Sequence, residues 1–321
     1  MNLESKKVQV DALSDNQEIM DGLVIDRLNK DIKDAVKDIT KPEVRYLVKL
    51  YYAVQKNRIK ISNQLSRYSQ NQKPCRYFNW QLKQFEKVER QIRAAMDVYS
   101  KCSNLGIWMR SICGVGPVTA SGFLSHIDWT RVHHAGSIWI YGGLDPSVKW
   151  EKGKKRPYNA DFKTLCWKQC DVFQKYKNKD TDFYGGFIEK RKKYEQAKNL
   201  RGDYKDQAYK VLNNLQAYNR SFSDENMKKL KAGQLTDGII QLRAFRWTAK
   251  LFISHIYDVY HIVQGKEPPI PYVLVYDPEN QGHTVKDYIK PPNLELAKQL
   301  ALESQEPKPK PKKKKLNIIK K

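Results

Sequence analysis

The residues best suited to bind a ligand form the segment Cys113-Gly114-Val115-Gly116-Pro117, which lies between two stretches of helical pattern. A tight Gly-x-Gly turn that joins two short helices leaves several backbone N–H groups without helical partners. Those groups, together with the positive end of the second helix, can bind a phosphate oxygen. The segment therefore predicts a helix-hairpin-helix phosphate site. The structural alternative is an ordinary turn between core helices.

We expect this turn to bind phosphate mainly through the main chain. The predicted contacts are Gly114, Gly116, the amides of Val118 and Thr119, and the nearby charge of Arg110. Backbone amides and cationic side chains contact phosphates and do not distinguish bases. These parts alone therefore predict binding with little sequence specificity.

A lysine-rich loop provides a second candidate contact strip. Residues 149–179 hold ten Lys or Arg against three acidic residues, and the Gly and Pro within 152–157 prevent a continuous helix. Trp150 and Tyr158 flank the strip and offer rings for stacking. The predicted basic contacts are Lys149, Lys152, Lys154, Lys155 and Arg156.

Evidence for catalysis in the sequence is limited to Ser147, the one candidate nucleophile. A serine nucleophile needs an adjacent base, and the sequence places none of the six histidines beside it. A hydrogen bond within the turn is the alternative role for this hydroxyl. Asp128 and Asp145 also read as turn residues, and His133-His134 has no Cys or carboxylate at metal-ligand spacing. We predict no metal site and no cofactor.

Composition restricts the class of protein. The 321 residues include 59 Lys and Arg against 35 Asp and Glu, which gives a formal charge of +24. Such an imbalance favours an anionic polymer as partner, with a merely soluble basic protein as the alternative. The five cysteines lack a Cys-x-x-Cys pair, and Cys166 and Cys170 read as core residues. With neither a signal peptide nor an apolar run near 18 residues, we expect a cytoplasmic, nucleoid-associated protein without membrane contact.

Two long helices must precede the turn. Apolar residues recur at alternating three- and four-residue steps over 44–68 and again over 78–99, which predicts an antiparallel hairpin. Each run has one gap, filled by Arg58 and by Glu89. Folding the hairpin about its polar loop pairs Tyr68 with Phe78 and sets Arg58 opposite Glu89. We predict an ion pair that fixes the register, against the alternative of two unrelated surface charges.

Beyond the hairpin we predict helices near 135–141, 183–199, 204–218 and 238–264, and a short extended piece at 272–276. The fold class is mainly α, with a disordered basic tail that holds eight lysines. The predicted divisions are a polar N-terminal segment (1–42), the coiled-coil hairpin (43–100), a helix-hairpin-helix domain (101–268) with a charged helical insertion at about 174–237, a C-terminal extension (269–306) and the tail (307–321).

The order of these motifs resembles the C-terminal domain of bridge-RNA-guided insertion-sequence transposases. The Gly-Val-Gly-Pro block at 114–117 and the Gly-Leu-Asp-Pro block at 143–146 carry the resemblance, with the helix at 244–252. It covers roughly 43–268, and the hairpin resembles the coiled coil that precedes this domain. The resemblance implies DNA transposition or recombination, with double-stranded DNA and a guide RNA as partners.

This chain departs from the family pattern in two ways. Family members begin with a RuvC-like DEDD domain whose four acidic residues hold metal ions, whereas about forty polar residues precede the hairpin here. The family's serine lies a few residues beyond the Gly-Leu-x-Pro block, whereas Ser147 directly follows the proline. A separately encoded DEDD nuclease that supplies the Mg²⁺ site, and a homodimer through the coiled coil, are therefore further expected partners.

Three functions remain open from the sequence. The chain is a transposase-derived DNA-binding protein, an active recombinase, or an RNA-binding or nucleic-acid-packaging scaffold without recombinase activity. The first is the function we expect, through phosphate contacts of the turn and the basic loop.

Overall fold

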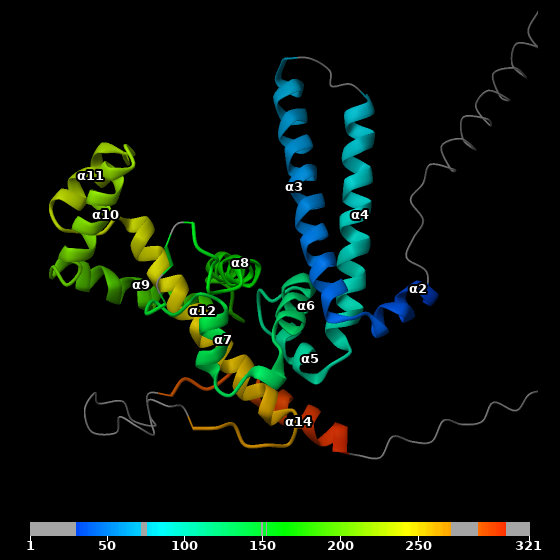
Figure 1. Ribbon diagram of the computed structural model, residues 1–321. Coiled ribbons are helices and arrows are strands. Elements are labelled where there is room, and N and C mark those ends of the chain that lie inside the picture. Colours follow the sequence, from blue (N-terminus) through cyan, green and yellow to red (C-terminus); the bar gives the residue numbers. More distant parts are fainter. Residues whose placement is uncertain (1–29, 72–75, 149, 152, 271–287, 306–321) are drawn as a thin grey trace, which may run out of the picture. The chain divides into compact units, whose positions relative to one another are not determined.

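A computed structural model describes residues 30–71, 76–148, 150–151, 153–270 and 288–305 (Figure 1). These residues form helices and the turns that join them, and no strand occurs among them. The predicted mainly α fold is confirmed. No helix within these ranges combines the length and apolarity that crossing a membrane requires. The predicted extended piece at 272–276 and the tail at 307–321 lie outside the described residues.

The chain divides into two compact units. The hairpin unit comprises the described residues within 1–102 and 116–126, and the second unit comprises those within 103–115 and 127–321. The chain therefore passes from one unit to the other between Val115 and Gly116, inside the predicted turn. Helix 117–126, which the sequence grouped with the domain at 101–268, packs with the hairpin.

The hairpin unit begins with a capped helix start. Thr40 donates to the Glu43 carboxylate from its backbone N–H, at 2.8 Å, and from its hydroxyl. This contact is one half of a capping box and supports the first turn. The elements of this unit are α2 (Lys30–Ala35), η1 (Val36–Asp38), α3 (Lys41–Asn71), α4 (Arg76–Lys101) and α6 (Pro117–His126).

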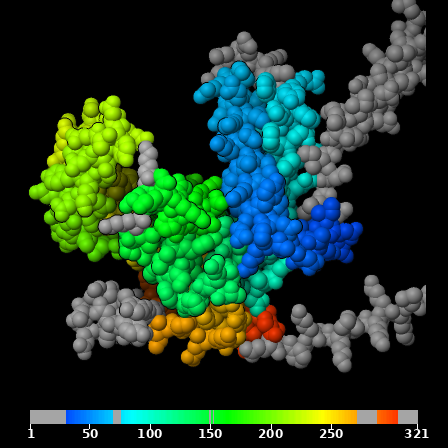
Figure 2. All heavy atoms as spheres, in the orientation of Figure 1, coloured from blue at the N-terminus to red at the C-terminus, as the bar shows by residue number. Residues whose placement is uncertain are grey.

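The two long helices pair in the predicted register. Arg58 Nε lies 2.5 Å from Glu89 Oε2, which confirms the predicted ion pair. The rings of Tyr68 and Phe78 lie 6.1 Å apart between centroids, at the other end of the seam. Figure 2 shows the atoms of α3 in blue and α4 in cyan side by side along the hairpin. The apolar residues that recur about every 3.5 positions therefore determine the pairing of the two helices in the hairpin.

Helix α6 packs against both hairpin helices (Figure 1). Val118 shares a buried apolar cluster with Val44 and Met96. Ser121 donates its hydroxyl proton to the Met96 carbonyl at 3.0 Å, so its buried oxygen is satisfied. The first turn of α6 is thereby anchored to the base of the hairpin.

The second unit is built around one long helix, α12 (Asp237–Ile262). The predicted helices near 135–141, 183–199, 204–218 and 238–264 are all present. The other elements of the unit are α5 (Asn104–Arg110), η2 (Trp129–Arg131), α7 (Ala135–Tyr141), α8 (Ala160–Tyr176), α9 (Tyr184–Leu200), α10 (Lys205–Ala217), α11 (Asp224–Lys231) and α14 (Leu294–Gln305).

The core of this unit joins α8, α9 and α12. The rings of Phe173, Tyr184 and Phe252 are buried and lie 4.6 to 5.3 Å apart between centroids. Cys166 and Cys170 are buried on the same side of α8, as predicted, and burial raises the pKa of both thiols. They contribute apolar packing rather than reactive thiolates.

The helix near the end of the described chain belongs to the same unit. Asn104 at the start of α5 donates to the carbonyl of Leu300 in α14 at 2.8 Å. Trp108, which is fully buried, donates its indole N–H to the Pro292 carbonyl at 2.8 Å. α14 and the residues just before it therefore pack against α5 and accept hydrogen bonds from two of its side chains.

Candidate nucleic-acid interface

The first glycine of the predicted turn is packed tightly. Gly114 has φ +86°, and a Cβ at this position would lie 3.3 Å from Val172 and 3.4 Å from Phe173 of α8. Its carbonyl accepts a hydrogen bond from Gln169 Nε2 at 3.1 Å. Both the backbone conformation and the contact require glycine. Gly114 therefore has a structural role that its sequence context did not reveal.

Arg110 supports the same half of the turn. Its guanidinium donates to the Val115 carbonyl at 2.9 Å, which closes the end of α5 onto the bend. The residue was predicted as an added charge beside a phosphate. In the structure it also holds the backbone of the bend.

The second glycine has the opposite environment. A Cβ on Gly116 would meet nothing within 4 Å. The Gly116 carbonyl accepts from the Ala120 amide at 3.0 Å, so this residue lies at the N-cap position, directly before α6. Val118 and Thr119 are 6% and 8% exposed as whole residues, and their amides donate to no acceptor among the described residues. The first turn of α6 thus has two unpaired donors next to Gly116, which is less buried than the residues that follow it.

The structure divides the predicted contacts between the two units. Gly116, Val118 and Thr119 belong to the hairpin unit, whereas Arg110 and Gly114 belong to the second unit. The basic loop also belongs to the second unit. The predicted contacts of each unit therefore form a separate candidate surface for nucleic acid.

The basic loop carries fewer free charges than its composition implies. Lys154 lies 2.8 Å from the Glu151 carboxylate, and both side chains are exposed. The Arg156 guanidinium lies 5.5 Å from the centroid of the Trp150 ring. Lys155 is exposed. Lys149 and Lys152 lie outside the described residues.

The two aromatic residues that flank the basic loop make contacts within the protein. Tyr158 packs on Gly143, where an added Cβ would lie 2.6 Å from the ring, and Lys163 Nζ lies 4.3 Å from its centroid. Trp150 donates its indole N–H to the Lys154 carbonyl at 2.7 Å and stays partly exposed. Trp150 is therefore the ring of this pair with more surface available to a ligand.

Ser147 makes the turn contact that the sequence offered as its alternative role. Its amide and its hydroxyl both donate to Asp145 Oδ1 at 2.9 Å. These two bonds lower the pKa of Asp145, which weakens that carboxylate as a base. The contact stabilises the turn after α7.

The other polar candidates have structural contacts. Asp128 accepts hydrogen bonds from the amide and the hydroxyl of Thr130, which caps η2. Within the described ranges, no group of three or more His, Cys, Asp or Glu residues could hold a metal ion.

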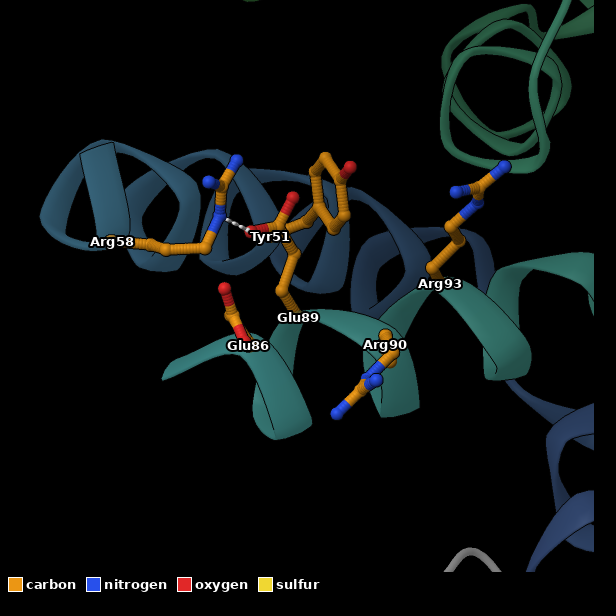
Figure 3. A pocket seen from close by; sticks show the side chains of 6 residues that line it. All are labelled: Tyr51, Arg58, Glu86, Glu89, Arg90 and Arg93. Carbon is orange, nitrogen blue, oxygen red and sulfur yellow. Dashed lines mark hydrogen bonds and ion pairs between the residues drawn. The ribbon is translucent and has the colours of Figure 1, made fainter. Parts of the chain in front are cut away.

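A groove of about 320 Å³ on the hairpin was not identified from the sequence. Its arginines are Arg58, Arg90 and Arg93, and its acidic residues are Glu86 and Glu89. Figure 3 shows Arg58 turned towards Glu89, whereas Arg90 and Arg93 extend away from that pair. Neither Arg90 nor Arg93 has an acidic partner among the described residues, and both are exposed. Two guanidinium groups are thus free to contact phosphates.

The Glu89 carboxylate is already satisfied. Burial alone would raise its pKa, but hydrogen bonds from Arg58, Gln55 and Tyr51 outweigh burial and lower it. The ionised carboxylate therefore compensates Arg58, and neither Arg90 nor Arg93 forms an ion pair with an acidic residue that the structure describes. The signal available in the sequence was the bias of the hairpin: α3 and α4 hold thirteen Lys or Arg against four acidic residues.

Comparison with protein-family models, with curated proteins and with solved structures gives no match to this chain.

Proposed function

We propose that this chain binds the sugar–phosphate backbone of double-stranded DNA. The observation that carries the proposal is the contrast between the two glycines of the bend. Side chains of α8 occupy the space beside Gly114, whereas an added Cβ on Gly116 would meet nothing within 4 Å. The amides that follow Gly116 have no hydrogen-bond partner among the described residues. Nothing in the packing requires a glycine at position 116. A close approach of a ligand to the backbone would require it.

The chemistry of the first turn of α6 suits a phosphate. The amides of Val118 and Thr119 have no hydrogen-bond partner among the described residues, and the helix dipole adds about half a positive charge at this end. Arg90 and Arg93 add cationic groups on the same unit. A formal charge of +24 on the whole chain favours association with any polyanion.

The process served by this binding is proposed from the resemblance. The order of the Gly-Val-Gly-Pro and Gly-Leu-Asp-Pro blocks supports a role in DNA transposition or recombination. The role of Ser147 as a nucleophile stays a prediction. So do three partners: a guide RNA, a separately encoded DEDD nuclease with Mg²⁺, and a second copy of this chain.

The proposal is tested by Gly116→Val. Fluorescence anisotropy with a labelled DNA duplex measures affinity at several salt concentrations. A valine at 116 should weaken binding about tenfold or more, because its methyl groups keep the phosphate from the amides. Gly238→Val is the matched control, because this glycine lies near the start of a helix and has nothing within 4 Å of an added Cβ.

Two outcomes would overturn the proposal. Equal affinity of Gly116→Val and the wild type for the duplex would remove α6 from the contact. Tighter binding of a structured RNA than of the duplex, at equal salt, would favour the RNA-binding scaffold instead.

A further inference from the structure

Four aromatic rings form a continuous strip where the two hairpin helices approach their connecting loop. Tyr68 of α3 lies 6.1 Å from Phe78 of α4 between ring centroids. Phe78 lies 5.9 Å from Tyr77, and Tyr77 lies 5.8 Å from Trp80. Each ring is within the range of an aromatic pair, so the strip crosses from one helix to the other.

Three of the four residues of the strip are exposed, and Phe78 is partly buried. Tyr77 is 56% exposed, Tyr68 is 41% exposed and Trp80 is 36% exposed. Tyr68 and Phe78 occupy seam positions of the hairpin, which the apolar period predicts, whereas Tyr77 and Trp80 lie outside that period. Tyr77 and Trp80 therefore contribute little to hairpin packing, although large exposed rings are costly to leave in water.

The charge around the strip has one sign. From position 44 to position 85 the sequence contains nine Lys or Arg and no Asp or Glu. Arg67 and Arg76 are exposed and flank the rings in sequence. An anionic ligand is thus complementary to this end of the hairpin, and a basic or neutral protein surface is not.

We propose that the strip of Tyr68, Tyr77, Phe78 and Trp80 binds unpaired bases of a single-stranded nucleic acid. Bases stack on exposed aromatic rings, and the neighbouring arginines and lysines follow the phosphates. Grooves that bind single strands combine the same two features, exposed aromatic rings and positive charge. The proposal goes beyond the duplex contact at α6, because paired bases conceal their faces within the duplex.

Tyr77→Ala and Trp80→Ala test the stacking surface. Affinity is measured by anisotropy for labelled oligothymidylate and for labelled oligouridylate, the DNA and RNA sources of unpaired bases. Each variant should lose about 5- to 100-fold in affinity, as removal of a stacking ring does elsewhere. Trp80→Phe keeps a ring and should retain most of the affinity. Tyr46→Ala is the control, because Tyr46 is 65% exposed on α3 but outside the strip.

The source of the bases follows from the two probes. A larger loss with oligouridylate assigns the strip to RNA, and a larger loss with oligothymidylate assigns it to single-stranded DNA. Equal losses leave both as ligands of one stacking surface.

Unchanged affinity in both alanine variants would overturn the proposal. So would a shift in oligomeric state without any loss of single-strand affinity, because the rings would then serve self-association. Should Trp80→Ala lose helicity, Tyr77→Ala and Trp80→Phe decide the question. Failure here leaves the duplex contact intact, because Gly116→Val is scored on duplex DNA and the strip variants on single strands.

Discussion

The Glu195 carboxylate in α9 accepts a 2.6 Å hydrogen bond from Arg243 Nε in α12, and the Glu195 side chain is 1% exposed. The same carboxylate accepts from Tyr204 at 2.6 Å and from Arg191 at 2.8 Å. Burial would raise the pKa of Glu195, but these three donors outweigh burial and lower it. One ionised carboxylate therefore joins α9 and α12 in the second unit.

Glu195→Gln should destabilise the second unit by about 2–4 kcal/mol, because it leaves two guanidinium groups with one neutral acceptor. Chemical unfolding followed by circular dichroism measures the change. Glu225→Gln is the control, because Glu225 is 79% exposed in its pair with Lys229, and should cost less than about 0.5 kcal/mol. Equal effects of the two variants would contradict the role of the Glu195 network.

The two glycines of the bend should respond differently to alanine. Gly114→Ala should cost about 1–3 kcal/mol, because φ is +86° and buried Phe173 blocks the new Cβ. Gly116→Ala should be neutral within about 0.5 kcal/mol, because its Cβ enters open space. Thermal unfolding of both variants compares them directly. A larger loss for Gly116→Ala would contradict the assignment of these environments.

The hairpin pair should show measurable coupling. A double-mutant cycle of Arg58→Met and Glu89→Gln should give about 1 kcal/mol, because both side chains are partly buried in the seam. The exposed pair Lys175–Asp171 in α8 is the control and should give about 0.3 kcal/mol. Coupling no larger than the control would mean that the pair does not contribute to the register energetically.

His255 should make stability depend on pH. Its Nε2 lies 2.7 Å from the Ile289 carbonyl, which can only accept, so Nδ1 accepts from Tyr184 Oη at 2.8 Å. Burial lowers the pKa of His255 from 6.5 to about 4. The unfolded chain therefore binds the proton first, and stability falls as pH decreases from about 6.5 to about 4, by at most ~1.4 kcal/mol per pH unit.

Asp258 should oppose this trend. Burial raises its pKa to about 6, against the hydrogen bond from Tyr288, so its folded form binds a proton before the unfolded chain does. Its contribution to stability increases as pH decreases from about 6 to about 4. Asp258→Asn should therefore steepen the loss on acidification, and His255→Gln should reduce it. Urea midpoints between pH 4.5 and 6.5 test both; unchanged slopes would contradict the two assignments.

Arg90→Ala and Arg93→Ala test the hairpin groove as a phosphate contact. Each should weaken duplex binding and reduce the slope of log K against log salt by about one. Arg201→Ala is the control, because Arg201 is exposed and already paired with Asp203 at 3.0 Å. An unchanged salt slope in both groove variants would remove the groove from the interface.

The sequence by itself determined the elements that local period and capping specify. The apolar steps of α3 and α4, with Arg58 and Glu89 in their gaps, predicted the hairpin and its register, because both depend only on spacing along two helices. The bounds of α7 and the approximate bounds of α12 followed from the same kind of local signal.

Only the tertiary structure decided which predicted residues are free to bind. Gly114 and Gly116 look alike in the sequence, but α8, about 55 positions further along the chain, fills the space at Gly114 and leaves Gly116 open. Burial of Glu195 among distant donors likewise depends on how helices pack. Such contacts join positions far apart in the chain, and no local pattern of residue types encodes them.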